Sequence, residues 1–397
     1  MNDVSKNLSV GEIADAELMH ILLTHFGCSQ YSSSSLIDFP DFDKSVLSAH
    51  FSKAGQLTKI SSSLENEQLE ILQHQIRRVL KATPNLVNDK SVQFSGKPII
   101  GKFECQYFSI FEIDETAPKP AMMLADHPFV LEVPFLEIGD SGIDSIRRIK
   151  ARNEIVLLLG LFTLDTRVPN NRSKFFWGLD SGDFETETEK RRSKWLQKIY
   201  LYEERVSDID WAEYKVSLPN IRLIEDREYL SISSISFSEP YVLPKSLGKM
   251  FSFYFSLPDS RRKQFLRASY WFNHARNSIS ESSSATLISL VQAIETLIPN
   301  QPSARCSECG AAIGSQLKKT FLDFLNAYAP ISNSSSSNVR NLLYDQRSRL
   351  VHGDGLFVSD QDIFNFSNPK LGQEMELTQH AFQSVRVALW NWLDRNE

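Results

Sequence analysis

The feature that most constrains the fold of this chain is a series of amphipathic patterns in its last third. Apolar residues recur there every three or four positions, in five consecutive segments. This is the spacing of one face of an α-helix, and each such face has to be covered by another helix. The segments run from Phe265 to Ile279, Leu287 to Ile298, Ile313 to Tyr328, Val339 to Leu350 and Phe382 to Trp392. The sequence therefore predicts an all-α helical bundle over residues 259–397.

The residues before this bundle mix helical and strand patterns. Helical spacing is found in residues 10–26, 64–81 and 143–164. Alternation typical of strands is found in residues 103–109 and 129–136, and residues 222–237 resemble a hairpin or a pair of strands. We expect a multidomain chain: an α+β region over residues 1–240, a linker over residues 241–258 that contains Pro244, Gly248 and Pro258, and the bundle.

Composition and charge exclude several classes of protein. Hydrophobic residues make up 42% of the chain and charged residues 23%, which is enough apolar material to build cores. The net charge of −6 gives no overall attraction to nucleic acid. From Asp259 onward, however, 14 basic residues stand against 13 acidic ones, while the preceding residues carry 29 against 36. Any binding of nucleic acid is therefore expected to be local and in the C-terminal third.

The strongest chemical signal lies at the end of the fourth predicted helix. The chain reads Tyr-Asp-Gln-Arg-Ser-Arg-Leu-Val-His-Gly over residues 344–353, so four residues separate Arg347 from His352. Five residues turn a helix by about 500°, which leaves the two positions about 140° apart around the axis. They converge only if His352 lies in the last turn and Gly353 ends the helix. A guanidinium holds phosphate oxygens and an imidazole moves protons, as phosphodiester chemistry requires. An Arg and a His at a helix C-terminus are also explained by favourable interaction with the helix dipole alone.

Together with the five-helix pattern and the second helix Val-Gln-Ala-Ile-Glu-Thr-Leu at 291–297, this ending resembles the HEPN superfamily, specifically its Apea-like branch. The resemblance covers residues 259–397 and implies a metal-independent endoribonuclease that acts as a homodimer, with a role in anti-phage defence or a toxin-like response. Arg347 and His352 match the Arg and His of the family motif. Ser348 departs from it, because the family commonly has Asn, Asp or His at that position. The alternative is a non-catalytic dimerisation or RNA-binding module that serves the N-terminal region.

The same resemblance gives expected roles to neighbouring residues. Arg347 would hold the scissile phosphate, and His352 would act as general acid or base toward the 2′-hydroxyl or the leaving oxygen. We expect Ser348, Asp345 and Glu295 to support this site. The cations that we expect to contact RNA are Arg349, Arg340 and Arg276.

A second motif, Cys306-Ser-Glu-Cys309-Gly, lies between the second and third predicted helices. This spacing can direct two thiolates at one zinc ion, but tetrahedral zinc needs four ligands and no second pair follows. A structural zinc shared across a dimer therefore stands as the alternative to a loop with two free thiols, and no cofactor is expected for catalysis. No apolar run reaches the length of a membrane span, and acidic residues replace the apolar part of a signal peptide, so we expect a cytoplasmic protein.

Overall fold

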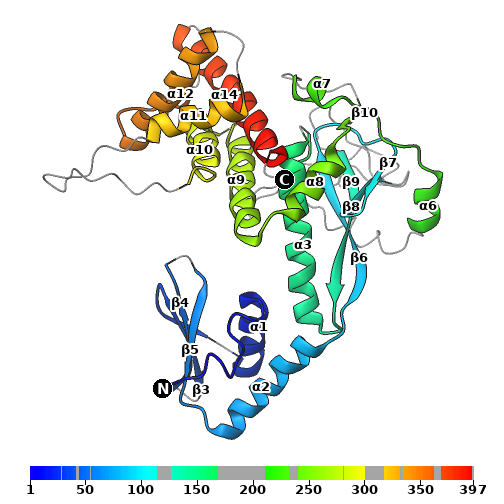
Figure 1. Ribbon diagram of the computed structural model, residues 1–397, viewed down its shortest axis with the longest axis vertical. Coiled ribbons are helices and arrows are strands. Elements are labelled where there is room, and N and C mark those ends of the chain that lie inside the picture. Colours follow the sequence, from blue (N-terminus) through cyan, green and yellow to red (C-terminus); the bar gives the residue numbers. More distant parts are fainter. Residues whose placement is uncertain are drawn as a thin grey trace, which may run out of the picture. The chain divides into compact units, whose positions relative to one another are not determined.

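The computed structural model describes residues 1–27, 29–41, 44–53, 55–113, 127–163, 165–168, 211–231, 240–279, 281–299, 317–330, 334–361 and 368–395 (Figure 1). The chain forms two compact units. The first consists of Met1–Asp89 and Pro134–Arg152, and the second of Lys90–Val133 and Asn153–Glu397. Three elements contribute residues to both units: strands β6 (Asn85–Ser95) and β9 (His127–Glu137) and helix α3 (Ser141–Phe162).

The first unit is built on a five-stranded antiparallel sheet in the order β1-β5-β4-β3-β2. Its strands are β1 (Asn2–Asp3), β2 (Gln30–Ser33), β3 (Leu36–Asp41), β4 (Lys44–Phe51) and β5 (Leu57–Ser62). Phe39 of β3 pairs with Leu47 of β4, and Ala49 of β4 pairs with Ile60 of β5, so these apolar side chains line one buried face.

Two helices of the first unit pack in the same core, α1 (Asp15–Phe26) and α2 (Asn66–Lys81). They contribute Leu18 and Leu22, and Leu72 and Ile76, all of which are buried. The start of α3 is held to α1 because Arg147 donates hydrogen bonds of 2.9 and 3.0 Å to Glu17. The helices expected near residues 10–26, 64–81 and 143–164 are therefore confirmed, with α1 beginning later than its pattern.

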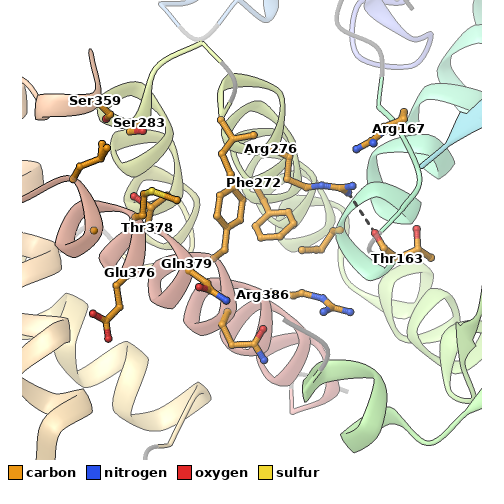
Figure 2. A pocket seen from close by; sticks show the side chains of 17 residues that line it. Thr163, Arg167, Phe272, Arg276, Ser283, Ser359, Glu376, Thr378, Gln379 and Arg386 are labelled. Carbon is orange, nitrogen blue, oxygen red and sulfur yellow. Dashed lines mark hydrogen bonds between the residues drawn. The ribbon is translucent and has the colours of Figure 1, made fainter. Parts of the chain in front are cut away.

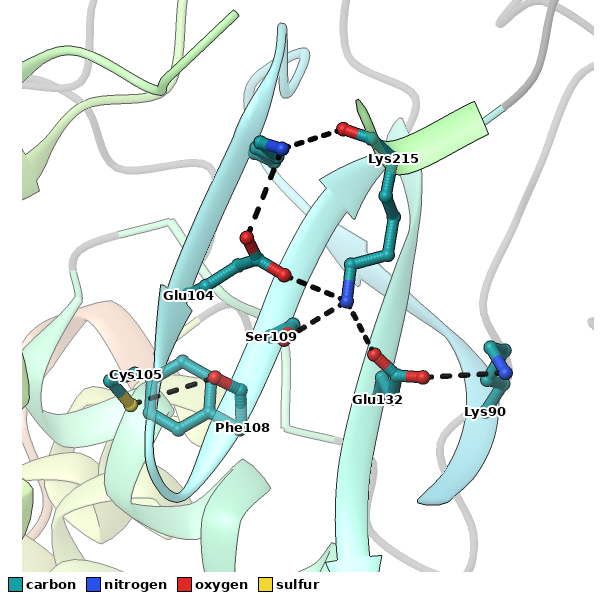
Figure 3. A network of polar contacts seen from close by, with 8 residues as sticks. Lys90, Glu104, Cys105, Phe108, Ser109, Glu132 and Lys215 are labelled. Carbon is teal, nitrogen blue, oxygen red and sulfur yellow. Dashed lines mark hydrogen bonds and ion pairs between the residues drawn. The ribbon is translucent and has the colours of Figure 1, made fainter. Parts of the chain in front are cut away.

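The second unit contains a four-stranded sheet in the order β6-β9-β8-β7, in which β7 is Lys102–Cys105 and β8 is Phe108–Glu112. The alternation at residues 103–109 thus belongs to two strands of a hairpin rather than to one strand. Helix α6 (Trp211–Ser217) contacts this sheet through Lys215, whose Nζ lies 2.6 Å from Glu132 Oε2 on β9 and 2.8 Å from Glu104 Oε1 on β7 (Figure 3).

Two expectations for the middle of the chain are wrong. Residues 241–258 are not a linker: they contain β11 (Leu243–Pro244) and α8 (Leu247–Ser256), and α8 buries Met250, Phe251 and Tyr254. The division between residues 1–240 and 259–397 is therefore not the division into compact units. The hairpin or pair of strands expected at residues 222–237 is not found in its described part, residues 222–231, because β10 (Leu223–Ile224) pairs in parallel with β11 and is followed by α7 (Asp226–Ser231). Residues 232–237 lie outside the described residues.

The C-terminal region is helical, as predicted. The five expected helices are α9 (Asp259–Ser278), α10 (Ser283–Glu295), α11 (Leu317–Tyr328), α12 (Ser334–His352) and α14 (Pro369–Asp394), and the short α13 (Val358–Gln361) precedes the last of them. Helix α10 contacts α9, α11, α12 and α14, and α14 also contacts α9, α11 and α12. The fully buried side chains at these contacts include Phe265, Leu290, Ile294, Phe321, Val385 and Leu389.

Candidate functional site at the end of helix α12

Helix α12 ends where the sequence predicts. Gly353 follows the helix with a φ of 80°, a left-handed conformation that glycine adopts without a steric penalty. The N–H of Gly353 donates to the carbonyl of Leu350 (3.3 Å), and the N–H of Asp354 donates to the carbonyl of Arg349 (2.9 Å). This pair of bonds is the Schellman motif, which satisfies carbonyls of the last helical turn. His352 is consequently fixed as the last residue of α12.

The Arg347 guanidinium is held by a residue from another helix. Its Nη2 donates to Oε2 of Glu295 over 2.7 Å, and Glu295 is the last residue of α10. The guanidinium also lies 5.9 Å from the centre of the Tyr344 ring. The side chains of Arg347 and Glu295 are 20% and 16% exposed, so the pair is partly shielded from water. The supporting role expected of Glu295 is thus consistent with its contact.

The imidazole of His352 is exposed to solvent. Among the described residues, no hydrogen bond, ion pair or ring contact joins it to Arg347. The two side chains therefore leave α12 in different directions, as five residues of helix require. One chain presents an anchored cation and, one turn farther on, an accessible proton-transfer group.

Asp345 and Ser348, which were also expected to support the site, make no side-chain hydrogen bond or ion pair with Arg347 in the described residues. Asp345 does not bind Arg347: its carboxylate accepts two hydrogen bonds of 2.6 and 2.8 Å from Lys318 of α11. Asp345 therefore does not support the site through a contact with Arg347, because it faces α11 and pairs with a lysine there. Ser348 is half-buried, and within the described ranges it makes no side-chain hydrogen bond.

The three expected RNA-binding arginines do not share a surface. Arg349 is exposed beside His352. Arg340 is only 4% exposed, and it donates to Asn326 Oδ1 (2.9 Å) and to the carbonyl of Ala329. Burial lowers the pKa of Arg340 from its usual value. Its expected contact with RNA is therefore wrong, because its guanidinium ties α12 to α11.

Arg276 lies away from the end of α12. Its Nη1 donates to the carbonyls of Gly160 and Thr163, at the end of α3. It lines a cavity together with Arg167 and Arg386. The expectation that Arg276 belongs to an RNA-binding surface with Arg349 and Arg340 is therefore wrong.

Arg386, which also lines this cavity, was not predicted from the sequence. It follows Val385 on α14, in register with Phe382 and Leu389, and so stands on the apolar stripe of that helix. A charged residue in such a stripe is the signal that could have identified it, since isolated arginines are seldom buried.

The predicted zinc ligands Cys306 and Cys309 lie outside the described residues. Within the part that is described, no group of three or more His, Cys, Asp or Glu side chains has the arrangement of a metal site. Likewise, none of the helices in the described ranges is both long enough and apolar enough to cross a bilayer. Comparison with models of known protein families, with curated proteins and with solved structures found no match to this chain.

Proposed function

We propose that this chain is a metal-independent endoribonuclease of the HEPN type, similar to the Apea-like branch, and that it cleaves RNA as a homodimer. The observation that carries the proposal is the end of α12, where Arg347 is anchored by Glu295 and His352 is exposed next to the left-handed Gly353. An anti-phage or toxin-like role follows from the family resemblance and is part of the proposal.

In the proposed reaction the 2′-hydroxyl oxygen attacks the adjacent phosphorus and the bond from phosphorus to the 5′-oxygen breaks. The imidazole of His352 accepts the proton of the 2′-hydroxyl, and the leaving 5′-oxygen takes up a proton. The products carry a 2′,3′-cyclic phosphate and a 5′-hydroxyl. Arg347 uses the guanidinium nitrogens that Glu295 does not occupy to stabilise the charge on the phosphate oxygens.

In this proposal a second copy of the chain supplies the second His352 that the reaction needs. Since Arg347 and His352 do not converge within one chain, the proposed active site needs two α12 ends, and two copies of His352 then provide one general base and one general acid. The exposed Arg349 lies where it can contact the flanking RNA backbone.

The test is RNA cleavage by the purified full chain in the presence of EDTA. We expect products with cyclic-phosphate ends, and we expect His352→Ala and Arg347→Ala each to reduce the rate by at least about 100-fold while the dimer persists in light scattering. Matched controls are His380→Ala, an exposed histidine of α14, and Arg227→Ala, an exposed arginine of α7, which should cleave at the unchanged rate. Cleavage that survives in both site variants would overturn the assignment.

The second candidate is an RNA-binding or dimerisation module without catalysis. It is favoured by the same observation that Arg347 is bound to Glu295 and makes no contact with His352. In that case the wild-type chain binds RNA in a gel-shift assay and leaves it intact in EDTA, and Arg349→Ala weakens binding more than Arg227→Ala does.

A further inference from the structure

A cavity in the second unit lies between the end of α3 and helices α9 and α14. It measures about 800 Å³, within the range of small-molecule sites. The wall is mostly apolar, with Leu161, Phe272, Leu371, Met375 and Phe382 on it. The rings of Phe272 and Phe382 meet edge to face, with their centres 5.9 Å apart.

Three arginines line this apolar cavity. Figure 2 shows Arg276 and Arg167 near Thr163, with Arg386 on α14 across from them. Arg386 is 4% exposed, and among the described residues no acceptor binds its Nε, Nη1 or Nη2. Its guanidinium lies 4.8 Å from the centre of the Tyr229 ring, which compensates only weakly for the loss of water. A buried guanidinium without an acceptor is costly, so its presence in a cavity wall indicates an absent acceptor.

The charges around Arg386 point to an anion. Burial first, and then the neighbouring charges of Arg167 and Arg386, lower the pKa of Arg276 to about 10 although the carboxylate of Asp165 acts in the opposite direction. The nearby carboxylate of Asp165 pairs with Lys97 at 3.8 Å and also attracts Arg276, Arg167 and Arg386, so one carboxylate faces four cations; burial nevertheless raises the pKa of Asp165. Glu376 also lines the cavity, but it is exposed. An oxyanion beside Arg386 would relieve the repulsion between the guanidiniums and supply the missing acceptor.

The two ends of the cavity differ. Figure 2 shows Ser283 and Ser359 at the end away from the arginines, and the Ser359 hydroxyl is buried without a partner in the described part of the chain. Phe272 lies between these ends in Figure 2. A ligand that fills the space therefore needs a charged head and an apolar body.

We propose that this cavity binds a small organic anion, whose phosphate or carboxylate head is held by Arg386 with Arg276 and Arg167 and whose apolar body lies against Phe272 and Phe382. This site is separate from the end of α12 and does not depend on the proposed nuclease activity.

Calorimetric titration of the full chain with octyl phosphate tests the proposal. We expect one site per chain and a dissociation constant at least tenfold lower than that of inorganic phosphate, which lacks the body, or of octanol, which lacks the charge. Octanoate provides the second headgroup. Binding equal to that of octyl phosphate supports a carboxylate ligand, and weaker binding supports a phosphate ligand.

Two variants of the cavity test it independently. Arg386→Met keeps the length of the side chain and should weaken the binding of octyl phosphate at least tenfold. This variant should still fold, because the substitution removes an unpaired buried charge. Gly372→Trp keeps Arg386 but fills the cavity, since a Cβ on the helical Gly372 meets nothing within 4 Å. Arg227→Met on the exposed surface is the matched control. Absence of binding to the wild type, or binding that both cavity variants leave unchanged, would overturn the proposal.

Discussion

The Nη2 atom of Arg347 lies 2.7 Å from Oε2 of Glu295, and this contact joins the ends of α12 and α10. It fixes a cation one helical turn from an exposed imidazole without using all of its N–H donors. The other carboxylate oxygen of Glu295, Oε1, is buried and has no partner in the described part of the chain. This bond is therefore the one hydrogen bond found in the described residues between Glu295 and Arg347, beside the contact of the guanidinium with the Tyr344 ring.

Glu295→Gln should weaken the hold on the Arg347 guanidinium while it preserves the volume of the side chain, because the amide oxygen can still accept a hydrogen bond but carries no charge. Loss of the charge from this partly buried pair costs about 1 kcal/mol of the free energy of unfolding. We expect cleavage of RNA to fall and RNA binding to change little, because the charge of Arg347 remains. Urea unfolding and single-turnover cleavage measure the two effects. Glu281→Gln, a control at an exposed position between α9 and α10, should change neither.

Gly353→Ala places a Cβ at a φ of 80° and should destabilise the chain by about 1–2 kcal/mol. The strain acts at the residue after His352, so cleavage should also decrease. Gly372→Ala is a control in which the same substitution should have the opposite effect on stability. Gly372 lies inside α14 in open space, and alanine there should stabilise the chain by about 0.5–1 kcal/mol. A destabilisation of equal size in both variants would contradict the role of the left-handed residue.

The sequence predicted those parts of the fold that depend on local periodicity. The five C-terminal helices, and Gly353 as the residue that ends α12, follow from apolar spacing and from the conformational freedom of glycine. Partners from other elements were not predictable in this way. Arg340 resembles a surface cation in the sequence, but the acceptors Asn326 and Ala329 come from α11 and its end.

The segment 241–258 is a second case in which contacts with other elements could not be predicted from the local sequence. Proline and glycine marked it as a linker, whereas Phe251 and Tyr254 of α8 are buried in the second unit. Burial of large aromatic side chains outweighs the turn signals of Pro244 and Gly248. The hydrogen bond of Glu295 to Arg347 likewise depends on the packing of α10 against α12, which apolar spacing in the sequence does not specify.

Asp360→Ala should weaken the start of α10. The Asp360 carboxylate accepts the N–H groups of Ser283 and Ser284 at 2.8 and 2.9 Å and the hydroxyl of Ser282 at 2.9 Å. Removing these acceptors from a helix N-terminus costs about 1–2 kcal/mol. Hydrogen exchange of the first turn of α10 is the direct measurement. Asp394→Ala, at an exposed site near the end of α14, should leave that exchange unchanged.

The same interaction of Asp360 has a pH dependence. Burial opposes the charge of Asp360, but the hydrogen bonds from Ser284 and Ser282 outweigh it and lower its pKa below the usual 3.8. A lowered carboxyl pKa stabilises the folded state above the unfolded value and loses that effect as the pH falls through the folded value. The difference between wild type and Asp360→Ala should therefore be constant above pH 5 and shrink below pH 3.8. A difference in stability between wild type and Asp360→Ala that stays constant down to pH 2 would contradict the role of the Asp360 carboxylate.

Lys215→Met should destabilise the sheet of the second unit by about 3 kcal/mol at neutral pH, because Glu132 is buried and, among the described residues, keeps only the contact with Lys90 at 3.3 Å. Burial alone would lower the pKa of Lys215, but its hydrogen bonds with Glu104 and Glu132 raise it above the usual 10.5. The hydrogen bond from Lys215 lowers the pKa of Glu104 below 4.5.

These shifts define the pH window of the effect. The stabilisation is fully present between the usual pKa of a glutamate, 4.5, and that of a lysine, 10.5. It is lost at acid pH as Glu104 becomes protonated, and at alkaline pH only above 10.5, where Lys215 loses its proton. Hydrogen exchange of β8 and β9 should therefore show the full difference between the wild type and Lys215→Met from about pH 6 to 10, and a smaller one below pH 4.5. Lys249→Met, which removes an exposed partner of Asp394, should shift stability by at most about 0.5 kcal/mol at any pH. If the two lysine variants behave alike, the network of Figure 3 contributes no more than a surface ion pair.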